Sequence, residues 1–275
     1  MPASASTQTD NAFAKPSTAE LTFADLAGLS DAADLVIRAQ IRRQIRVKAE
    51  RAPGLQAGFA RLYIEARTLA LVSGNVPIGE SLRYLVDVPL TAKGKVPKLK
   101  RKEVLLFARA PSSARGNSAA GATQIQLVSP HAQQAYSPYI EERLRPILSE
   151  MAGPEAPARV TGVRDALSVS GNLAGESETQ IFLKTDDGAP VSIAVLRRPS
   201  LEPVWGVSWG EIIDQSARPP RPQTVGWFRL ACNLPPSLPS SANLSRDRTQ
   251  RMQAERDYRF VMGALGTCER NLPQG

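Results

Sequence analysis

The feature that most limits the fold is a stretch near the N-terminus in which apolar and polar residues alternate. From Leu35 to Lys48 the sequence reads LVIRAQIRRQIRVK, with isoleucines at 37, 41 and 45 and basic or amide side chains at the even positions from 38 to 48. A period of two is typical of a strand with one buried and one solvent-exposed face. The isoleucines would also line one side of a helix, but their β-branched side chains favour a strand. We therefore expect a strand whose solvent-exposed face is basic and carries Arg38, Arg42 and Arg46.

Four further segments of the first half have the same strand character: 61–72, 82–88, 103–110 and 123–128. A short helix is expected before the strands, over 22–33. A longer helix is expected after them, because Ser137 and Pro138 suit the cap and first turn of a helix. Five strands followed by a helix predict an OB-like antiparallel barrel, with a β-sandwich as the alternative.

The Pro- and Gly-rich segment 152–157, AGPEAP, divides the chain. Such a segment is typical of a domain boundary. We expect a disordered tail over 1–20, a β-barrel-like domain with a terminal helix over 21–151, and an α+β domain over 158–270.

Three strands are expected in the C-terminal domain, over 179–184, 191–196 and 203–209, and two helices, over 224–234 and 245–265. For 224–234 a strand is the alternative. An Asp-Asp-Gly sequence at 186–188 is typical of the turn of a β-hairpin. The two helices would pack on this small antiparallel sheet. The predicted fold class of the whole chain is therefore α+β and rich in strands.

The charge of the chain favours anionic partners. It carries 34 Lys and Arg residues against 26 Asp and Glu residues, a net charge of +8. Such a balance does not choose among nucleic acid, anionic lipid and acidic polymers. Six cations lie together in the segment TAKGKVPKLKRK, 91–102: Lys93, Lys95, Lys98, Lys100, Arg101 and Lys102. In a barrel this loop would join the third and fourth strands, where such loops clamp single-stranded nucleic acid. The alternative is a solvated turn that binds nothing, since aromatic residues are only 5% of the chain.

No set of residues matches a known active site. The stretch GVSWG, Gly206–Gly210, has the spacing of the nucleophile elbow of α/β-hydrolases. In those enzymes a histidine follows the serine, whereas the single histidine of this chain, His131, precedes it. One histidine and two cysteines also leave too few ligands for a typical zinc site. We expect no catalytic residue, metal or cofactor, and an enzyme with an unfamiliar site is the alternative.

Two cysteines bear on the compartment. Cys232 ends the first expected C-terminal helix and Cys268 follows the second, so antiparallel packing of the helices would bring them together. The alternative is two inert buried thiols. Because disulfides persist outside the reducing cytoplasm, a bridge predicts a periplasmic or secreted protein whose leader is absent from this sequence. Without a bridge, we expect a cytoplasmic protein. No stretch approaches the roughly 18 consecutive apolar residues that a membrane-spanning helix needs.

Three segments are similar to those of an uncharacterised bacterial protein family: IGESLRYLVDVP at 78–89, GESETQIFL at 175–183 and WGVSW at 205–209. The resemblance extends over 22–270. No activity is assigned to that family, so the resemblance implies no function and no site residue.

Two functions are open on this basis. The first is a non-catalytic binding or assembly module outside the cytoplasm, with an unknown partner such as another protein. The second is a cytoplasmic binder of nucleic acid or another anionic polymer. It would use Arg38, Arg42, Arg46 and the lysine-rich loop.

Overall fold

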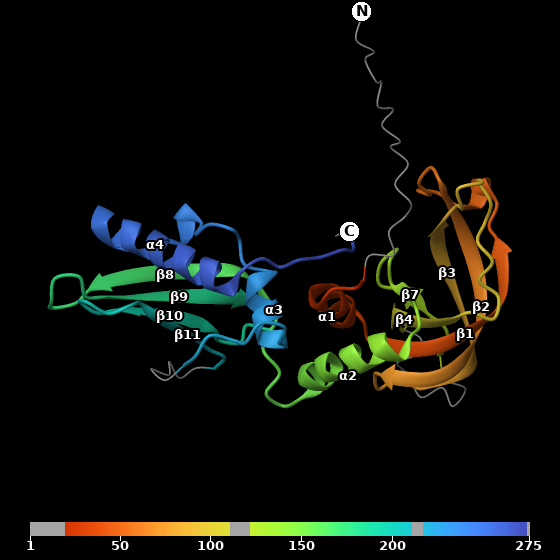
Figure 1. The fold of residues 1–275 in the computed structure, drawn as a ribbon, viewed down its shortest axis with the longest axis horizontal. Coiled ribbons are helices and arrows are strands. Elements are labelled where there is room, and N and C mark those ends of the chain that lie inside the picture. Colours follow the sequence, from red (N-terminus) through yellow and green to blue (C-terminus); the bar gives the residue numbers. More distant parts are fainter. Residues whose placement is uncertain (1–19, 111–121, 211–216, 274–275) are drawn as a thin grey trace, which may run out of the picture.

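The computed structural model describes residues 20–110, 122–210 and 217–273, and in this part of the chain it contains two β-sheets and four α-helices (Figure 1). The predicted class, α+β and rich in strands, is confirmed. The tail expected over 1–20 lies outside the described residues, apart from Glu20.

The first sheet has seven strands: β1 (Leu35–Arg46), β2 (Phe59–Ser73), β3 (Ile78–Pro89), β4 (Glu103–Arg109), β5 (Ala122–Gln124), β6 (Gln126–Leu127) and β7 (Gln133–Ala135). Their order is β5-β3-β2-β1-β4-β6, and β7 also pairs with β4. The first four expected strands are present, but the fifth is divided. Its first part pairs with β3 at one edge and its second part with β4 at the other. The sheet is open, so the predicted OB-like barrel is not confirmed.

The inner face of this sheet is apolar. Leu82, Tyr84, Val86 and Val88 of β3 are buried, as the alternation in the sequence predicted. They pack against alternating apolar residues of β1, β2 and β4. A hydrophobic interior of this kind needs no polar partner, so the charged residues of the sheet lie at its surface.

The predicted basic face of β1 is wrong, because the strand does not keep its alternation. Ile41 pairs with Ala66 of β2 and Arg43 pairs with the next residue, so Arg42 is an extra residue in the strand. Such a β-bulge moves the side chains that follow to the other face. Arg38 and Arg46 therefore lie on opposite faces.

The second sheet has four antiparallel strands in the order β11-β10-β9-β8: β8 (Val160–Ser170), β9 (Ser177–Thr185), β10 (Ser192–Arg197) and β11 (Val204–Ser208). The expected hairpin is present as β9 and β10. β8 was not predicted, because two register shifts against β9 interrupt its apolar pattern. The helices α3 (Val225–Ala231) and α4 (Arg248–Leu265) are both present, and α4 lies along this sheet (Figure 1).

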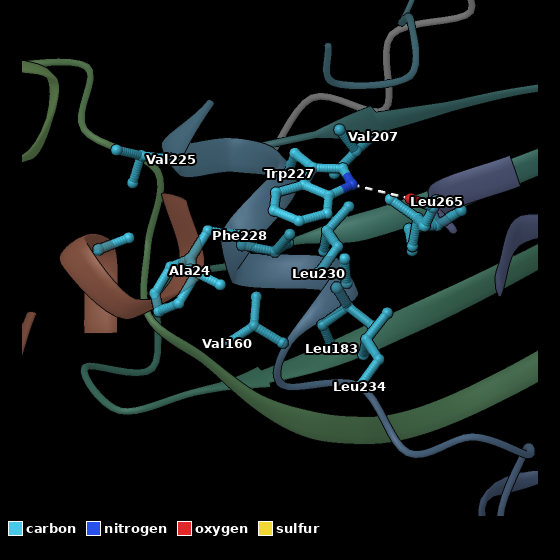
Figure 2. Close-up of a cluster of buried hydrophobic side chains, with 14 of the residues drawn as sticks. Ala24, Val160, Leu183, Val207, Val225, Trp227, Phe228, Leu230, Leu234 and Leu265 are labelled. Atoms are coloured by element: carbon cyan, nitrogen blue, oxygen red, sulfur yellow. Dashed lines mark hydrogen bonds between the residues drawn. The ribbon is translucent and has the colours of Figure 1, made fainter. Parts of the chain in front are cut away.

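The helix α1 (Phe23–Ala32) lies between the two sheets, next to α2 (Pro138–Ala152) (Figure 1). Thr22 and Asp25 form a capping box at the start of α1, and Ser137 caps α2 as predicted. Ala24 of α1 belongs to the same cluster of buried side chains as Val160 and Trp227 of the C-terminal half (Figure 2). The indole Nε1 of Trp227 donates a hydrogen bond of 2.8 Å to the carbonyl oxygen of Leu265. One hydrophobic cluster thus extends across the proposed domain boundary.

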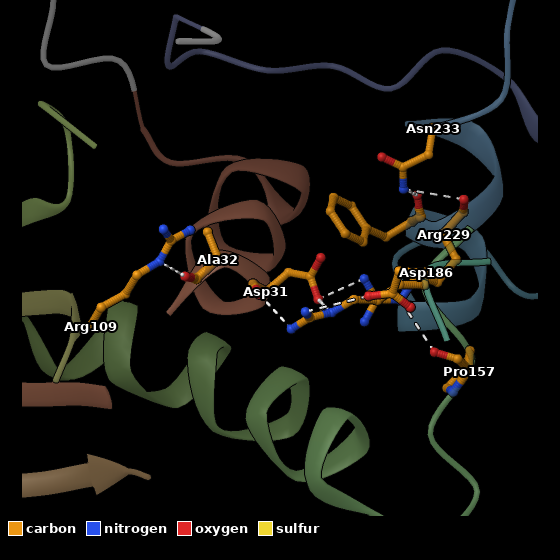
Figure 3. Close-up of polar contacts among 9 residues, drawn as sticks. Asp31, Ala32, Arg109, Pro157, Asp186, Arg229 and Asn233 are labelled. Carbon is orange, nitrogen blue, oxygen red and sulfur yellow. Dashed lines mark hydrogen bonds and ion pairs between the residues drawn. The ribbon is translucent and has the colours of Figure 1, made fainter. Parts of the chain in front are cut away.

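Ion pairs reinforce this junction. Asp31, at the end of α1, accepts from Nε of Arg159 at 2.8 Å and lies 2.7 Å from Nη1 of Arg229 (Figure 3). The side chain of Arg229 is only 5% exposed. A buried guanidinium needs a carboxylate partner, so Asp31 is a structural residue.

The C-terminal segment returns to α1. Cys232 and Cys268 lie together as a disulfide pair. Just beyond Cys268, the backbone amides of Asn271 and Leu272 donate to the carboxylate of Asp25 at 3.0 and 3.1 Å. The cysteine pair therefore connects α3 to a segment that contacts α1.

Candidate functional site

The lysine-rich loop, 91–102, is attached along the second half of β1. The side-chain amide of Gln44 donates to the carbonyl oxygen of Pro97 at 2.9 Å and accepts from the amide of Leu99 at 2.6 Å. Ile41 exchanges two backbone hydrogen bonds with the end of the loop, at 2.8 and 3.0 Å. The loop thus continues the sheet beside β1.

Two tight turns give the loop a defined backbone. At its start, the amide of Gly94 donates to the carbonyl oxygen of Thr91 at 2.7 Å, and Gly94 has a φ of +67°. At its end, the amide of Lys102 donates to the carbonyl oxygen of Leu99 at 2.9 Å, and Arg101 has a φ of +69°. A non-glycine residue in this left-handed region is uncommon and requires support from its surroundings. The Arg101 backbone obtains that support from Ile41.

The loop and β1 together form what we call the basic surface: Arg42, Arg46, Lys93, Lys95, Lys98, Lys100, Arg101 and Lys102. All eight residues are exposed. Among the described residues, none of the eight forms an ion pair with a carboxylate. Within the described structure, these eight charges are therefore exposed to solvent without a salt bridge.

Arg38, which was expected to belong to this surface, has a different environment. Its guanidinium lies 2.7 Å from a carboxylate oxygen of Glu103 and 4.0 Å from one of Glu141, and it stacks 3.7 Å from the ring centre of Tyr136. The hydrogen bond to Glu103 raises the pKa of Arg38 above its ordinary value. These contacts link β1 to the start of α2. We therefore interpret Arg38 as a structural residue and leave it out of the basic surface.

A groove of about 760 Å³ runs along the outer side of β2 and β3. Tyr63, Arg83 and Leu85 lie on one side of it, and the segment 124–130 lies on the other. Its volume is within the range of small-ligand sites. At its floor Tyr84 is buried and its hydroxyl donates to Oε1 of Gln133 at 2.8 Å. Burial raises the pKa of Tyr84 far above its ordinary value, so this hydroxyl stays neutral.

The structure does not support a nucleophile elbow at Gly206–Gly210. Ser208 is the last residue of β11, where it is buried and pairs with Ser192 in an antiparallel sheet, whereas a nucleophile elbow exposes its serine at the end of a strand in a parallel sheet. Gly206 has a packing role, because a Cβ atom there would clash with the backbone carbonyl group of Ala217.

The other polar cluster of note surrounds Asp257 of α4. This carboxylate is fully buried, and it accepts from Nε of Arg197 at 2.6 Å, from Gln253 at 2.9 Å and from the hydroxyl of Thr179. Its hydrogen-bonding capacity is used within the protein, so we interpret it as the polar contact that fixes α4 on the sheet. Within the described ranges, no group of three or more His, Cys, Asp or Glu residues is placed to hold a metal ion.

Comparison with known proteins gives no family. No protein-family model matches the sequence, and no curated protein is significantly similar to it. None of the described helices is long and apolar enough to cross a membrane. The basic surface and the groove are therefore the candidate functional sites. The basic loop had a clear sequence signal, its lysines, whereas the groove was missed because its two sides come from separate segments.

Proposed function

We propose that this chain is a non-catalytic binding module that holds an anionic polymer on the basic surface. The observation that carries the proposal is the absence of carboxylate partners for the eight cations in the described structure, on a loop whose backbone is hydrogen-bonded to β1. A turn that only keeps the protein soluble needs the lysine charges, but it does not need backbone hydrogen bonds to β1. A loop held in place loses less conformational entropy on binding than a free loop does.

The cysteine pair bears on the nature of the polymer. A disulfide between Cys232 and Cys268 is compatible with an oxidising compartment outside the cytoplasm. In that setting, the polymer would be an anionic component of the cell envelope. If the two thiols are instead reduced in the cell, a cytoplasmic nucleic acid would take its place on the same surface.

The test is the salt dependence of binding to a labelled 20-nucleotide oligothymidylate, used as a flexible polyphosphate. Each phosphate contact to a single strand contributes about −0.7 to the slope of log K against log salt, so about five contacts predict a slope near −3.5. The double variant Lys98→Gln, Lys100→Gln should lower this slope in magnitude by about 1.4, while its unfolding free energy stays that of the wild type.

The matched control is Lys184→Gln, Arg198→Gln, which removes two exposed cations, one in β9 and one just after β10. It should leave the slope unchanged, because long-range net charge contributes little above about 0.1 M salt. Undetectable binding at 20 mM salt, or an equal loss in both double variants, would rule out the basic surface. Poly-glutamate, measured in parallel, shows whether carboxylate polymers bind as well as phosphate polymers.

A further inference from the structure

The second half of β3 forms an unpaired sheet edge within the groove. β5 pairs with β3 only as far as Arg83, whose carbonyl oxygen accepts from the amide of Ile125 at 3.2 Å. From Gln126 onward the segment bonds to β4 instead. The ladder between β3 and the 124–130 segment therefore ends where the groove begins.

Strand geometry identifies which backbone groups face this edge. The amide and carbonyl of one residue point to the same side of a strand, and those of the next residue point to the other side. Because Arg83 faces β5, Leu85 and Asp87 face the same side. Leu90 gives an independent check, since its amide donates to Gly58 at the start of β2, so even-numbered residues face β2. No residue of the described structure pairs with Leu85 or Asp87 at this edge.

The side chains around the edge are suited to a bound strand that carries both apolar and acidic side chains. Leu85 is 53% exposed, and Leu127 and Val128 lie across the groove from it. Apolar side chains of a bound strand would cover Leu85. This combination of free backbone groups and an exposed apolar side chain is typical of sites that bind a peptide by strand addition.

The charges in the groove favour a carboxylate. Arg61 is neutralised by Asp87 through two hydrogen bonds of 2.7 Å. Arg83 is exposed and has no ion-pair partner within the described part of the chain. Its cross-strand neighbour on β2 is Glu65, which lies 3.9 Å from Arg43. Among the described residues, the guanidinium of Arg83 is therefore left without a salt bridge, next to the end of the paired ladder.

We propose that the groove beside β3 binds an extended segment of another protein, which adds as a strand to Leu85 and Asp87 and places an acidic side chain on Arg83. A phosphate polymer has no alternating backbone donors and acceptors and does not satisfy this edge. From Arg83 to Asp87 the strand is about 13 Å long, enough for four or five peptide residues. The proposal is independent of the basic surface, which involves other residues.

The test uses acetylated and amidated seven-residue peptides that alternate valine and threonine, with one aspartate placed at each position in turn. The full chain is titrated with each peptide, and binding is followed by NMR through the backbone amides of Leu85 and Asp87. We expect these two amides to shift and to gain protection from hydrogen exchange. Replacing the aspartate of the best peptide with asparagine should weaken binding about tenfold.

Two controls separate strand addition from unspecific contact. Methylating alternate backbone nitrogens of the best peptide removes its donors and should abolish binding, without any change to the protein. Arg83→Gln should remove the preference for aspartate over asparagine. Arg67→Gln, an exposed arginine of β2 outside the groove, should preserve it. Leu85→Pro removes one backbone donor at an edge, where proline is tolerated, and should weaken binding at least tenfold.

Three results would overturn the proposal. One is that none of the peptides shifts Leu85 or Asp87 at millimolar concentration. Another is that the methylated peptide binds as well as the parent. The third is that light scattering shows a dimer that Leu85→Pro dissociates, since the occupant would then be a second copy of this chain. None of these three results bears on the oligothymidylate experiment. The protein variants used with the peptides, Arg83→Gln, Arg67→Gln and Leu85→Pro, retain Lys98 and Lys100.

Discussion

The two sheet regions differ in where they keep their polar groups. In the seven-stranded sheet and its loops, 35–135, the buried side chains that the structure describes are apolar, with Tyr84 as a partly polar exception. The buried charged residues, Asp25, Arg229 and Asp257, all lie in α1 or in the C-terminal half. That half also contains the cysteine pair.

This difference shows which charges have structural roles. Around the second sheet, Asp257 and Arg229 have their partners inside the protein, and their removal would leave a buried charge unpaired. Among the described residues of the first sheet and its loops, no charged side chain is buried, so none there needs a buried partner. Among the described residues, the cations of the basic surface have no carboxylate partner, and we propose that these cations and the edge of β3 bind other molecules. The following predictions test this contrast between a half with structural charges and a half with surface charges.

The largest change in the free energy of unfolding is expected on removal of the bridge between the two cysteines. A bridge between residues 36 apart should contribute about 4 kcal/mol in the chain-entropy model. Cys232→Ala, Cys268→Ala should therefore lower the free energy of unfolding by about that amount in urea titrations. The amides of Asn271 and Leu272 should also lose protection from hydrogen exchange, because the bridge holds this segment near Asp25.

The reduced wild type is the control for the double alanine variant, and both should have the same stability. A loss below about 1 kcal/mol would show that the fold of this half does not depend on the bridge. A non-reducing peptide map that finds both thiols free would remove the basis of the prediction and of the oxidising compartment together.

The next largest loss of unfolding free energy is expected on replacing Asp31. Asp31→Asn would leave Arg229 without its carboxylate in a nearly buried site, and such losses cost about 3 kcal/mol. Urea unfolding of the wild type and the variant measures the change. Asp186→Asn is the matched control. Asp186 lies 3.7 Å from Arg159 with its side chain 44% exposed, so its loss should cost less than about 1 kcal/mol. Equal effects at the two positions would contradict a structural role for Arg229.

The sequence was informative where a pattern is local. The alternation in Leu35–Arg46 predicted β1, the caps at Thr22 and Ser137 suit α1 and α2, and the Asp-Asp-Gly turn predicted the β9–β10 hairpin. In each case one short segment determines its own conformation. The lysine-rich loop belongs to the same category, because its charge can be counted without knowing the fold.

The sequence was not informative where the outcome depends on a distant partner. The bulge at Arg42 arises from pairing with β2, so the basic face of β1 was predicted wrongly. Arg38 has the same sequence context as Arg42, yet its partners Glu103 and Glu141 are 65 and more residues away. The groove depends on the place where the 124–130 segment leaves β3 for β4, and no local pattern indicates that point.

The smallest loss of stability is expected on replacing Glu141, a partner of Arg38. Together with Glu103 and Asp87, it is one of the carboxylates that form ion pairs around the first sheet. Burial alone would raise the pKa of this carboxyl, but hydrogen bonds from Tyr136 and Arg145 and the charges of Arg145 and Arg38 lower it below 4.5. A carboxyl whose pKa is lower in the folded state stabilises the fold above its unfolded pKa, and this contribution is lost as the pH falls.

Glu141→Gln should therefore cost less than about 1 kcal/mol at pH 7, and the difference from the wild type should shrink at pH 3. Glu142→Gln, at the exposed neighbouring position, should have no effect at either pH. A cost for Glu141→Gln that is the same at both values of pH would show that packing, and not charge, links β1 to α2.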